Sequence, residues 1–117
     1  MHPSTYAATT PDKPAIIVAG TGETISYAEL DAASNRAAQL FCAHGLGHDD
    51  VVAFMLENTP HYYGLTWGAQ RAGLRYVCIS SRLTQDETDY ILENSGAKIL
   101  IVSADLAPAA QQLTTRI

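Results

Sequence analysis

Four side chains of the metal-ligating type stand close together in the sequence: His44, His48, Asp49 and Asp50. The i, i+4 spacing of the two histidines would place both rings on one face of a helix. Gly45 and Gly47 interrupt such a helix, so the pattern favours a solvated loop over a metal site. A further histidine, His61, is expected in the first turn of a later helix, where it is interpreted as structural or exposed.

Two glycine-containing stretches resemble phosphate-binding loops only in part. Gly20-Thr21-Gly22 follows an expected strand, but a third glycine is absent and Thr24-Ile25-Ser26 continues as a strand, so the stretch predicts a hairpin turn rather than a dinucleotide loop. Gly96-Ala97-Lys98 is the nearest approach to a GxxxxGK[ST] loop, and it precedes a strand instead of following one. Neither stretch predicts a nucleotide site.

The sequence gives equally weak support for a serine nucleophile and for a phospho-acceptor carboxylate. Ser80-Ser81 follows an expected strand, but no GxSxG elbow and no evident base accompany it. A phospho-acceptor receiver domain needs carboxylates after its first strand and a lysine after its last, whereas Asp49-Asp50 and Lys98 precede strands. The Tyr63 and Trp67 stripe is interpreted as core packing. We therefore predict no catalytic, cofactor-binding or metal-ligating residue in this chain.

Length and composition limit the classes of protein. With 117 residues the chain is long enough for one domain with a core, and its net charge of −5 without a basic stripe argues against nucleic acid as a partner. No run of 18 apolar residues predicts a membrane span, and the N-terminus lacks the pattern of a secretory signal. Cys42 and Cys78 lie in apolar segments and are predicted to be buried free thiols, which indicates the cytoplasm.

The element that organises the chain is a strand–helix–strand unit. Val51–Leu56 is a continuous apolar run, typical of a strand covered on both faces. Thr59 and Pro60 are expected to cap and begin a helix that ends at Gly73, and Tyr76–Ile79 is the next strand. The connection of about twenty residues suits a parallel βαβ crossover.

The helix of this unit carries small residues at every fourth position. Gly64, Gly68 and Ala72 share one face, and Tyr63, Trp67 and Arg71 form a neighbouring stripe. Glycine inside a helix costs about 0.5–1 kcal/mol relative to alanine, so two on one face predict the close approach of another backbone. We expect this helix to be buried on more than one side, between a sheet and a further layer.

The remaining elements follow from capping and turn signals. A short helix at Tyr6–Ala8, a strand at Ala15–Ala19 and a returning strand at Thr24–Ser26 are expected first. Capping boxes begin two further helices, Ser26 with Glu29 and Thr84 with Glu87. The first should end at Gly45 and bury one face, and the second at Gly96. That buried face is expected to comprise Leu30, Ala33, Ala37, Leu40 and Phe41. A third apolar strand, Lys98–Val102, and a weak helix over 104–117 complete an α/β pattern with a mainly parallel sheet.

Several segments, taken in order, resemble the adenylate-forming enzymes, a family of acyl-CoA synthetases, peptide synthetase adenylation domains and luciferase. Ile25-Ser26-Tyr27-Ala28-Glu29-Leu30 is similar to the first core motif, and Ala72-Gly73-Leu74-Arg75-Tyr76-Val77 to the start of the second. The N-terminus resembles that of the acyl-CoA synthetase branch, and so does the segment from Ser81-Arg82-Leu83-Thr84 through Ser95-Gly96-Ala97-Lys98. Cys78 and Ser80 depart from it, standing where the family usually has proline and asparagine.

The resemblance implies that residues 1–117 are the N-terminal portion of an AMP-binding domain, part of a three-layer α/β fold. Within it, 1–49 would form the opening segment, hairpin and first helix, and 50–117 a βαβαβα unit. The implied parent is an ATP-dependent acyl-CoA synthetase that uses ATP, Mg²⁺ and coenzyme A. The family's phosphate loop, adenine-binding segment, ribose aspartate and C-terminal lysine are absent from these 117 residues.

We therefore expect a structural part of a larger cytoplasmic ligase, inactive alone, whose main partner is the remainder of the enzyme. Exposed apolar surface would also favour self-association. The alternative is a self-sufficient small α/β binding or interaction module, which would be a monomer that unfolds cooperatively.

Overall fold

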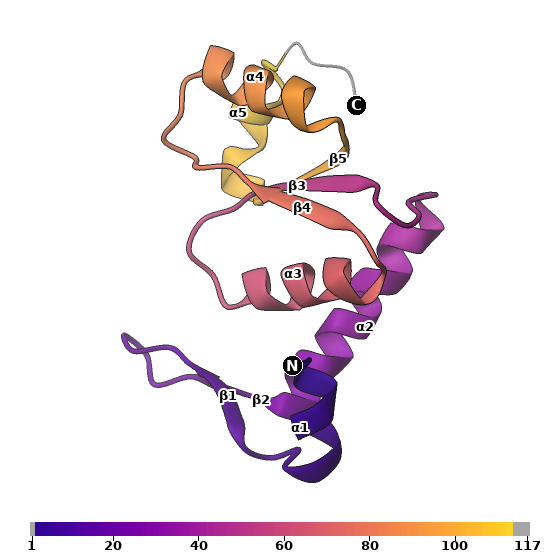
Figure 1. The fold of residues 1–117 in the computed structure, drawn as a ribbon. Helices are drawn as coiled ribbons and strands as arrows, with labels where there is room; N and C mark the ends of the chain where they lie inside the picture. Colours follow the sequence, from indigo (N-terminus) through magenta and orange to yellow (C-terminus); the bar gives the residue numbers. More distant parts are fainter. Residues whose placement is uncertain (1, 114–117) are drawn as a thin grey trace. The chain divides into compact units, whose positions relative to one another are not determined.

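The computed structural model describes residues 2–113, which form two compact units. One unit comprises Met1–Gly45 and Pro60–Ala72, and the other comprises Leu46–Thr59 and Gly73–Ile117. The first contains α1 (Pro3–Thr9), β1 (Pro14–Ile17), β2 (Thr24–Ser26), α2 (Tyr27–Ala43) and α3 (His61–Arg71) (Figure 1). The second contains β3 (Val51–Met55), β4 (Arg75–Cys78), α4 (Gln85–Ser95), β5 (Ala97–Val102), the 3₁₀ turn η1 (Ala104–Leu106) and α5 (Ala107–Ala110). We call these the helical unit and the sheet unit.

The helical unit is built on direct contact between α2 and α3. Gly68 is buried, and a Cβ atom added to it would lie 2.5 Å from Cβ of Ala37 and 2.9 Å from the carbonyl oxygen of Ser34. A Cβ on Gly64 would lie 3.1 Å from that of Ala33. The predicted close approach of a second backbone is therefore confirmed, and the backbone is that of α2 in this same chain.

Local signals fix both ends of α2. Ser26 and Glu29 form the predicted capping box: Glu29 N–H donates to Ser26 Oγ at 3.2 Å, and Ser26 N–H donates to the Glu29 carboxylate at 3.0 Å. At the other end Gly45 adopts a φ of +81°, which an L side chain rarely tolerates. The capping box and Gly45 therefore determine where the helix begins and ends through local interactions.

The buried face of α2 differs from the predicted one: Ala33 is only partly buried, and Leu40 is exposed. Leu30, Ala37 and Phe41 are buried as expected, but Leu40 is 48% exposed. Ser34 and Ala38 complete the buried face instead. The prediction for Leu40 was wrong because a close contact between two helices selects small side chains, so size as well as apolarity decides which face is buried.

The N-terminal elements are of the predicted types, but their lengths differ from the predicted ones. Helix α1 is longer than the predicted Tyr6–Ala8, because Pro3 occupies its first turn, where no N–H is needed. The hairpin is antiparallel, with Ile16 opposite Ile25. Its first strand ends at Ile17 rather than Ala19, since Val18 already accepts a turn hydrogen bond from Gly22 N–H at 2.8 Å.

The sheet unit contains a parallel three-stranded sheet in the order β4-β3-β5. Val52, Ala53 and Phe54 of the central strand β3 have no exposed surface, which explains its continuous apolar run. Met55 and Ala53 join Ile79, Leu92 and Ala97 in the core. The predicted α/β class with a parallel sheet is confirmed.

Exposure of both cysteines corrects one prediction. Cys78 ends β4, an edge strand whose residues are mostly exposed, and Cys42 lies in the last turn of α2. Both thiols are free, as predicted, but exposed rather than buried. The apolar segments around them indicated burial, yet a residue next to a buried one on a helix or an edge strand often faces outward.

Helix α4 matches its signals. Thr84 and Glu87 form the second capping box, and Gly96 caps the C-terminus with a φ of +67°. After β5 the predicted helix over 104–117 is reduced to η1 and the four-residue α5, while residues 114–117 lie outside the described part. A helix this short is marginally stable without tertiary packing, even when its residues have good helix propensity.

Two details of α3 differ from the prediction. The residue that precedes it is Pro60, which makes no side-chain cap, so Thr59 is not the N-cap. Tyr63, assigned to the core, is 53% exposed, whereas Trp67 of the same stripe is half-buried. Gly73, with a φ of +75°, follows the C-cap as expected.

Candidate functional site

The loop before β3 holds most of the candidate metal ligands, and its carboxylates contact basic side chains on two strands of the sheet. Asp50 accepts a hydrogen bond from Gly47 N–H at 2.8 Å, and its other oxygen lies 2.8 Å from the Lys98 ammonium on β5. The Gly47 N–H, followed by Lys98, holds the pKa of the Asp50 carboxyl below its ordinary value. The carboxylate therefore joins the loop to β5 through its contact with Lys98.

Asp49 makes the corresponding connection to β4. Its carboxylate lies 3.2 Å from Arg75 Nε and 3.3 Å from His48 Nδ1, and its N–H donates to the Gly73 carbonyl at 2.9 Å. Asp49 itself has a φ of +67°, held by these contacts. His44, by contrast, is the C-cap residue of α2. Across residues 2–113, no three His, Cys, Asp or Glu side chains form a metal-binding group.

This charged cluster lies at the amino ends of the parallel strands. Asp50 directly precedes β3, Arg75 begins β4 and Lys98 is the second residue of β5. Open α/β sheets bind their ligands at the opposite, carboxyl ends. The ion pairs of this cluster join the loop before β3 to β4 and β5, which is consistent with a structural role.

At the carboxyl ends the candidates are hydroxyl groups. Ser80 follows β4, is exposed, and accepts a hydrogen bond from Arg82 N–H at 3.2 Å, so it forms a turn. Ser103 follows β5, and its Oγ is buried without a hydrogen-bond partner among the residues described. The sequence reasoning missed Ser103, although its position directly after a strand was a usable signal. Within the described residues 2–113, no histidine or carboxylate is therefore hydrogen-bonded to the Ser103 hydroxyl.

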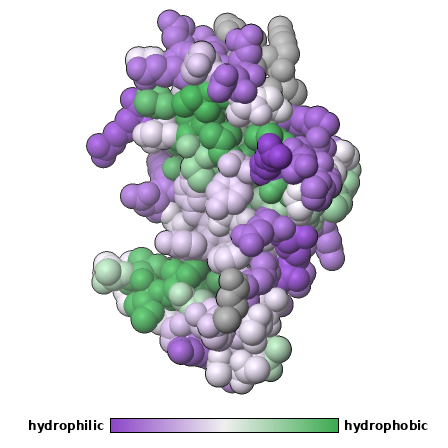
Figure 2. All heavy atoms as spheres, in the orientation of Figure 1, coloured by the Kyte–Doolittle hydropathy of each residue, from purple (hydrophilic) through white to green (hydrophobic). Residues whose placement is uncertain are grey.

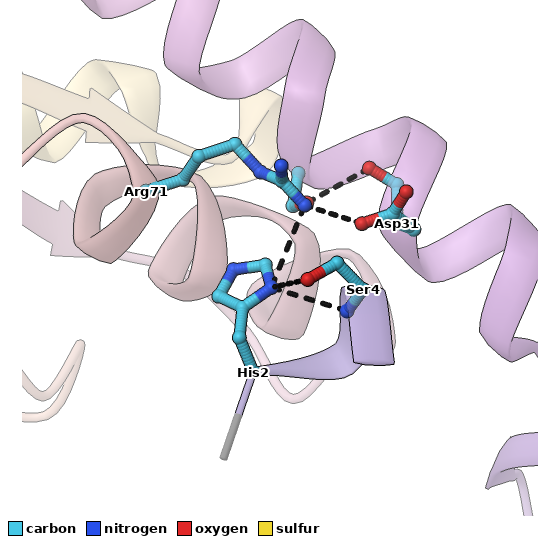
Figure 3. Close-up of polar contacts among 5 residues, drawn as sticks. His2, Ser4, Asp31 and Arg71 are labelled. Atoms are coloured by element: carbon cyan, nitrogen blue, oxygen red, sulfur yellow. Dashed lines mark hydrogen bonds and ion pairs between the residues drawn. The ribbon is translucent and has the colours of Figure 1, made fainter. Parts of the chain in front are cut away.

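The helical unit contains a polar cluster around Arg71 (Figure 3). From α3, Arg71 Nε donates to Ser34 Oγ at 3.3 Å and Nη2 contacts the Asp31 carboxylate, both on α2. The same Nη2 lies 3.5 Å from His2 Nδ1 (Figure 3). The Arg71 and Asp31 side chains are 28% and 25% exposed, and Ser34 is fully buried.

His2 and Ser4 are a histidine–hydroxyl pair that acts as a helix cap. His2 Nδ1 accepts from Ser4 N–H at 3.1 Å and lies 3.1 Å from Ser4 Oγ (Figure 3). A backbone donor at Nδ1 requires that this nitrogen be unprotonated. The ring also packs edge-on against Trp67, with centroids 5.2 Å apart. His2 thus anchors α1 to α3, and its geometry is that of a structural contact.

The sequence reasoning missed this cluster. It noted Arg71 only as a member of an aromatic stripe and did not link it to His2 or Asp31. A polar residue followed by proline is a recognised start of a helix, and this signal could have identified His2 as a cap. The pairing of Arg71 with Asp31 is long-range and left no local signal.

The other candidate residues have structural positions. Gly22 supplies the φ of +74° required by the hairpin turn, so the Gly20–Gly22 stretch is a turn as predicted. Gly96 caps α4, and His61 is the first residue of α3. None of the helices described over residues 2–113 is long and apolar enough to cross a membrane.

Comparison with known proteins gives strong matches over nearly the whole chain. The sequence model of the AMP-binding enzyme family matches residues 4–116. Long-chain fatty acid transport protein 1 of Homo sapiens is 36% identical over 104 residues, 89% of this chain and 16% of that protein. Crotonobetaine/carnitine–CoA ligase of Citrobacter koseri is 36% identical over 94 residues, 80% of this chain and 18% of the ligase.

The fold is similar to that of solved structures. The N-terminal domain of FACL13 from Mycobacterium tuberculosis aligns with a TM-score of 0.89 at 30% identity, over 97% of this chain and 29% of that domain. MatB from Rhodopseudomonas palustris aligns with a TM-score of 0.79, also at 30% identity, over 95% of this chain and 23% of its own. The chain therefore spans about a fifth of the length of the curated relatives it matches.

Proposed function

The chain belongs to the AMP-binding enzyme family, and from that premise we propose that it is the N-terminal structural part of an ATP-dependent carboxylate–CoA ligase. In this proposal residues 1–117 are scaffold and do not catalyse the reaction alone. Residues 1–49 supply the opening segment, hairpin and first helix, and residues 50–117 supply the βαβαβα unit of the larger domain.

One observation carries the proposal. Nearly all of this chain, 97%, superimposes on less than a third, 29%, of the FACL13 N-terminal domain. This difference in coverage supports the proposal that the chain forms one part of a larger domain. The contacts in the candidate clusters support a structural role, because the polar groups of Asp50 and Arg71 are engaged with neighbours in the fold.

The proposed reaction of the full-length enzyme is acid activation followed by thiol transfer. The carboxylate attacks ATP to give an acyl-adenylate and pyrophosphate, with Mg²⁺ assisting, and coenzyme A then displaces AMP to give the thioester. We assign the binding of ATP, Mg²⁺ and coenzyme A to parts of the enzyme outside residues 1–117. The remainder of the enzyme is accordingly the main partner of this chain.

The identity of the acid is assigned to the same outside parts. Relatives that match this region include ligases named for crotonobetaine or carnitine and for 3-hydroxybenzoate. Because these acids differ in charge, shape and polarity, a segment common to the ligases is a poor place to encode the choice. We propose a cytoplasmic enzyme, where ATP and coenzyme A are available and the free thiols of Cys42 and Cys78 stay reduced.

The proposal is tested on the full-length protein. Purified enzyme is incubated with ATP, Mg²⁺, coenzyme A and a panel of aliphatic and aromatic acids, and acyl-CoA is measured by mass spectrometry. We expect a thioester with at least one acid and none when ATP is omitted. A full-length protein that forms neither acyl-adenylate nor thioester with any acid would overturn the proposal.

A further inference from the structure

Helix α1 is a short helix whose attachment to the helical unit depends on contacts near its start. It has seven residues, of which only Pro3 is buried. On the face shown in Figure 2, the strongly apolar surface of the helical unit lies at the hairpin, on the lower left, and not at α1. Helices of this length are marginally stable in water without tertiary packing. The side chains that link α1 to its neighbours therefore decide whether it stays docked.

His2 links α1 to α3, and it does so through Nδ1. This nitrogen accepts a hydrogen bond from Ser4 N–H at 3.1 Å, which caps α1, and it lies 3.5 Å from Nη2 of Arg71 on α3 (Figure 3). The ring packs edge-on against Trp67 of the same helix. An N–H donor and a guanidinium both face a nitrogen lone pair, so these contacts require a neutral imidazole with its proton on Nε2.

A proton on Nδ1 would oppose each of these polar contacts. Ser4 N–H would lose its acceptor, because both nitrogens of an imidazolium are donors. The new charge would face the Arg71 guanidinium, and like charges repel. Nε2 is buried and has no hydrogen-bond partner within the described part of the chain, so the imidazolium would gain no bond there.

The acidic group nearest to this contact does not offset the repulsion. Arg71 of α3 and Asp31 of α2 are the charged side chains that the described contacts bring to the cluster. Asp31 contacts the Arg71 guanidinium, and Figure 3 shows that guanidinium between the Asp31 carboxylate and the His2 ring. The carboxylate is therefore paired with the cation that is already present.

We propose that His2 is a pH-sensitive latch: its neutral ring holds the start of α1 on α3, and protonation of the ring releases α1. The usual N-cap residues, Ser, Thr, Asn and Asp, satisfy a backbone N–H without a charge change near neutral pH. Histidine is the side chain whose ordinary charge change falls between about pH 5 and 8. The inference concerns the docking of α1 and goes beyond the proposed ligase reaction, on which it does not depend.

Amide hydrogen exchange of the full-length enzyme tests the inference. Protection of the amides from Ala7 to Thr10 is measured at about pH 7.5 and about pH 5.5, and each exchange rate is divided by the intrinsic rate at that pH. We expect the protection of α1 to fall about threefold or more at the lower pH, within the limit of about tenfold per pH unit that one titrating group imposes. The amide of Ala69, a buried residue of α3, is the internal reference. Equal protection of α1 at the two pH values would overturn the inference.

Two substitutions distinguish His2 from the other titrating groups. His2→Asn keeps a side-chain acceptor for Ser4 N–H and removes the charge change, so α1 should be equally protected at both pH values. His44→Asn removes an exposed histidine at the end of α2, in the same unit, and should retain the pH dependence of the parent enzyme. A loss of α1 protection at low pH that persists in His2→Asn would assign the effect to another group, and the inference would be wrong.

The tautomer of His2 provides a readout that does not depend on exchange rates. Nitrogen NMR of ¹⁵N-histidine-labelled enzyme distinguishes a protonated ring nitrogen from an unprotonated one, and the signal lost in His2→Asn identifies His2. At about pH 7.5 we expect an unprotonated Nδ1 and a protonated Nε2. A His2 ring that carries its proton on Nδ1 at this pH could not accept from Ser4 N–H, and that result would refute the latch.

Discussion

At the scale of single residues, the most demanding position is Gly68. It is buried where α3 meets α2, and an added Cβ would lie 2.5 Å from Cβ of Ala37 and 2.9 Å from a backbone oxygen. Real Cβ atoms do not approach so closely, and a backbone oxygen cannot turn away as a flexible side chain can. The glycine is therefore explained by the packing of two helices rather than by a turn.

Gly68→Ala is predicted to destabilise the chain. Overpacking a tight contact costs about 1–3 kcal/mol, which exceeds the ~0.5–1 kcal/mol gained when alanine replaces glycine inside a helix. Urea unfolding followed by circular dichroism measures the change. Gly20→Ala is the control, since nothing lies within 4 Å of its added Cβ. Two variants of equal stability would contradict the packing argument.

The Asp50 carboxylate predicts a pH dependence. Its pKa is lower in the folded chain than the ordinary value of 3.8, owing to Gly47 N–H and then Lys98. A lowered folded pKa means that the ionised carboxylate stabilises the fold above pH 3.8, and that this contribution is lost as the pH falls through the folded pKa.

Asp50→Asn should therefore unfold more readily than the parent chain at neutral pH, and the difference should shrink below about pH 4. Thermal melts from pH 2.5 to 7 provide the measurement. Asp12→Asn is a suitable control, because Asp12 is exposed and makes no ion pair among the residues described. A stability difference for Asp50→Asn that is constant over this range would exclude the ion pair as its cause.

The roles of some residues could be predicted from their neighbours in the sequence, and the roles of others could not. Ser26, Glu29 and Gly45 were predicted correctly because a cap or a left-handed turn depends on residues within four positions. Leu40 was placed wrongly, since the choice between two adjacent helical positions depends on the partner helix. The link from Arg71 to Asp31 was missed because it joins residues 40 positions apart.

At the scale of elements, the helices begin and end where short-range hydrogen bonds dictate. In α4 the Thr84 hydroxyl accepts from Glu87 N–H at 3.2 Å, and the Glu87 carboxylate accepts from Thr84 N–H at 3.0 Å. Both donors would otherwise lack partners in the first turn. The capping box therefore fixes the start of the helix that contributes Leu92 to the core.

Thr84→Ala should cost about 1 kcal/mol of stability, whereas Thr84→Gly should cost only a few tenths. Glycine adopts the cap conformation readily and leaves the backbone open to water, so the pair separates the lost hydrogen bond from a general effect of substitution. Guanidinium unfolding of the two variants checks the order. A larger loss for glycine than for alanine would contradict the capping explanation.

The order of the strands in the sheet could not be predicted from the apolar pattern of the sequence alone. Continuous apolar runs predicted the strands of the sheet unit, and their alternation with helices predicted a parallel sheet, as found. The central position of β3 leaves no signal in its own sequence, because the flanking runs are apolar as well. Exposure on β4, including Cys78, follows from its place at the edge and could not be read from the run itself.

At the scale of the whole molecule, the described residues 2–113 form two compact units, and a polar cluster within each unit links neighbouring elements of the fold. One charged cluster joins the loop before β3 to β5, and the other joins α3 to α2. Motif order and spacing were sufficient to identify the family, which the match over residues 4–116 confirms. The prediction that no site residue lies in this chain remains a prediction.

The alternative, a self-sufficient binding module, predicts a different surface and a different oligomeric state. Such a module would cover its apolar surface and remain a monomer. Ile17 and Tyr90 are each 67% exposed, and since single apolar side chains are common at protein surfaces, light scattering of the isolated chain is the measurement that separates the two alternatives.

The central claim is tested most directly by ATP–pyrophosphate exchange. The isolated 117-residue chain and the full-length enzyme are assayed side by side with Mg²⁺ and the same panel of carboxylic acids. The account predicts exchange by the full-length enzyme and a rate equal to the protein-free blank for the isolated chain. Acid-dependent exchange by the isolated chain would contradict it.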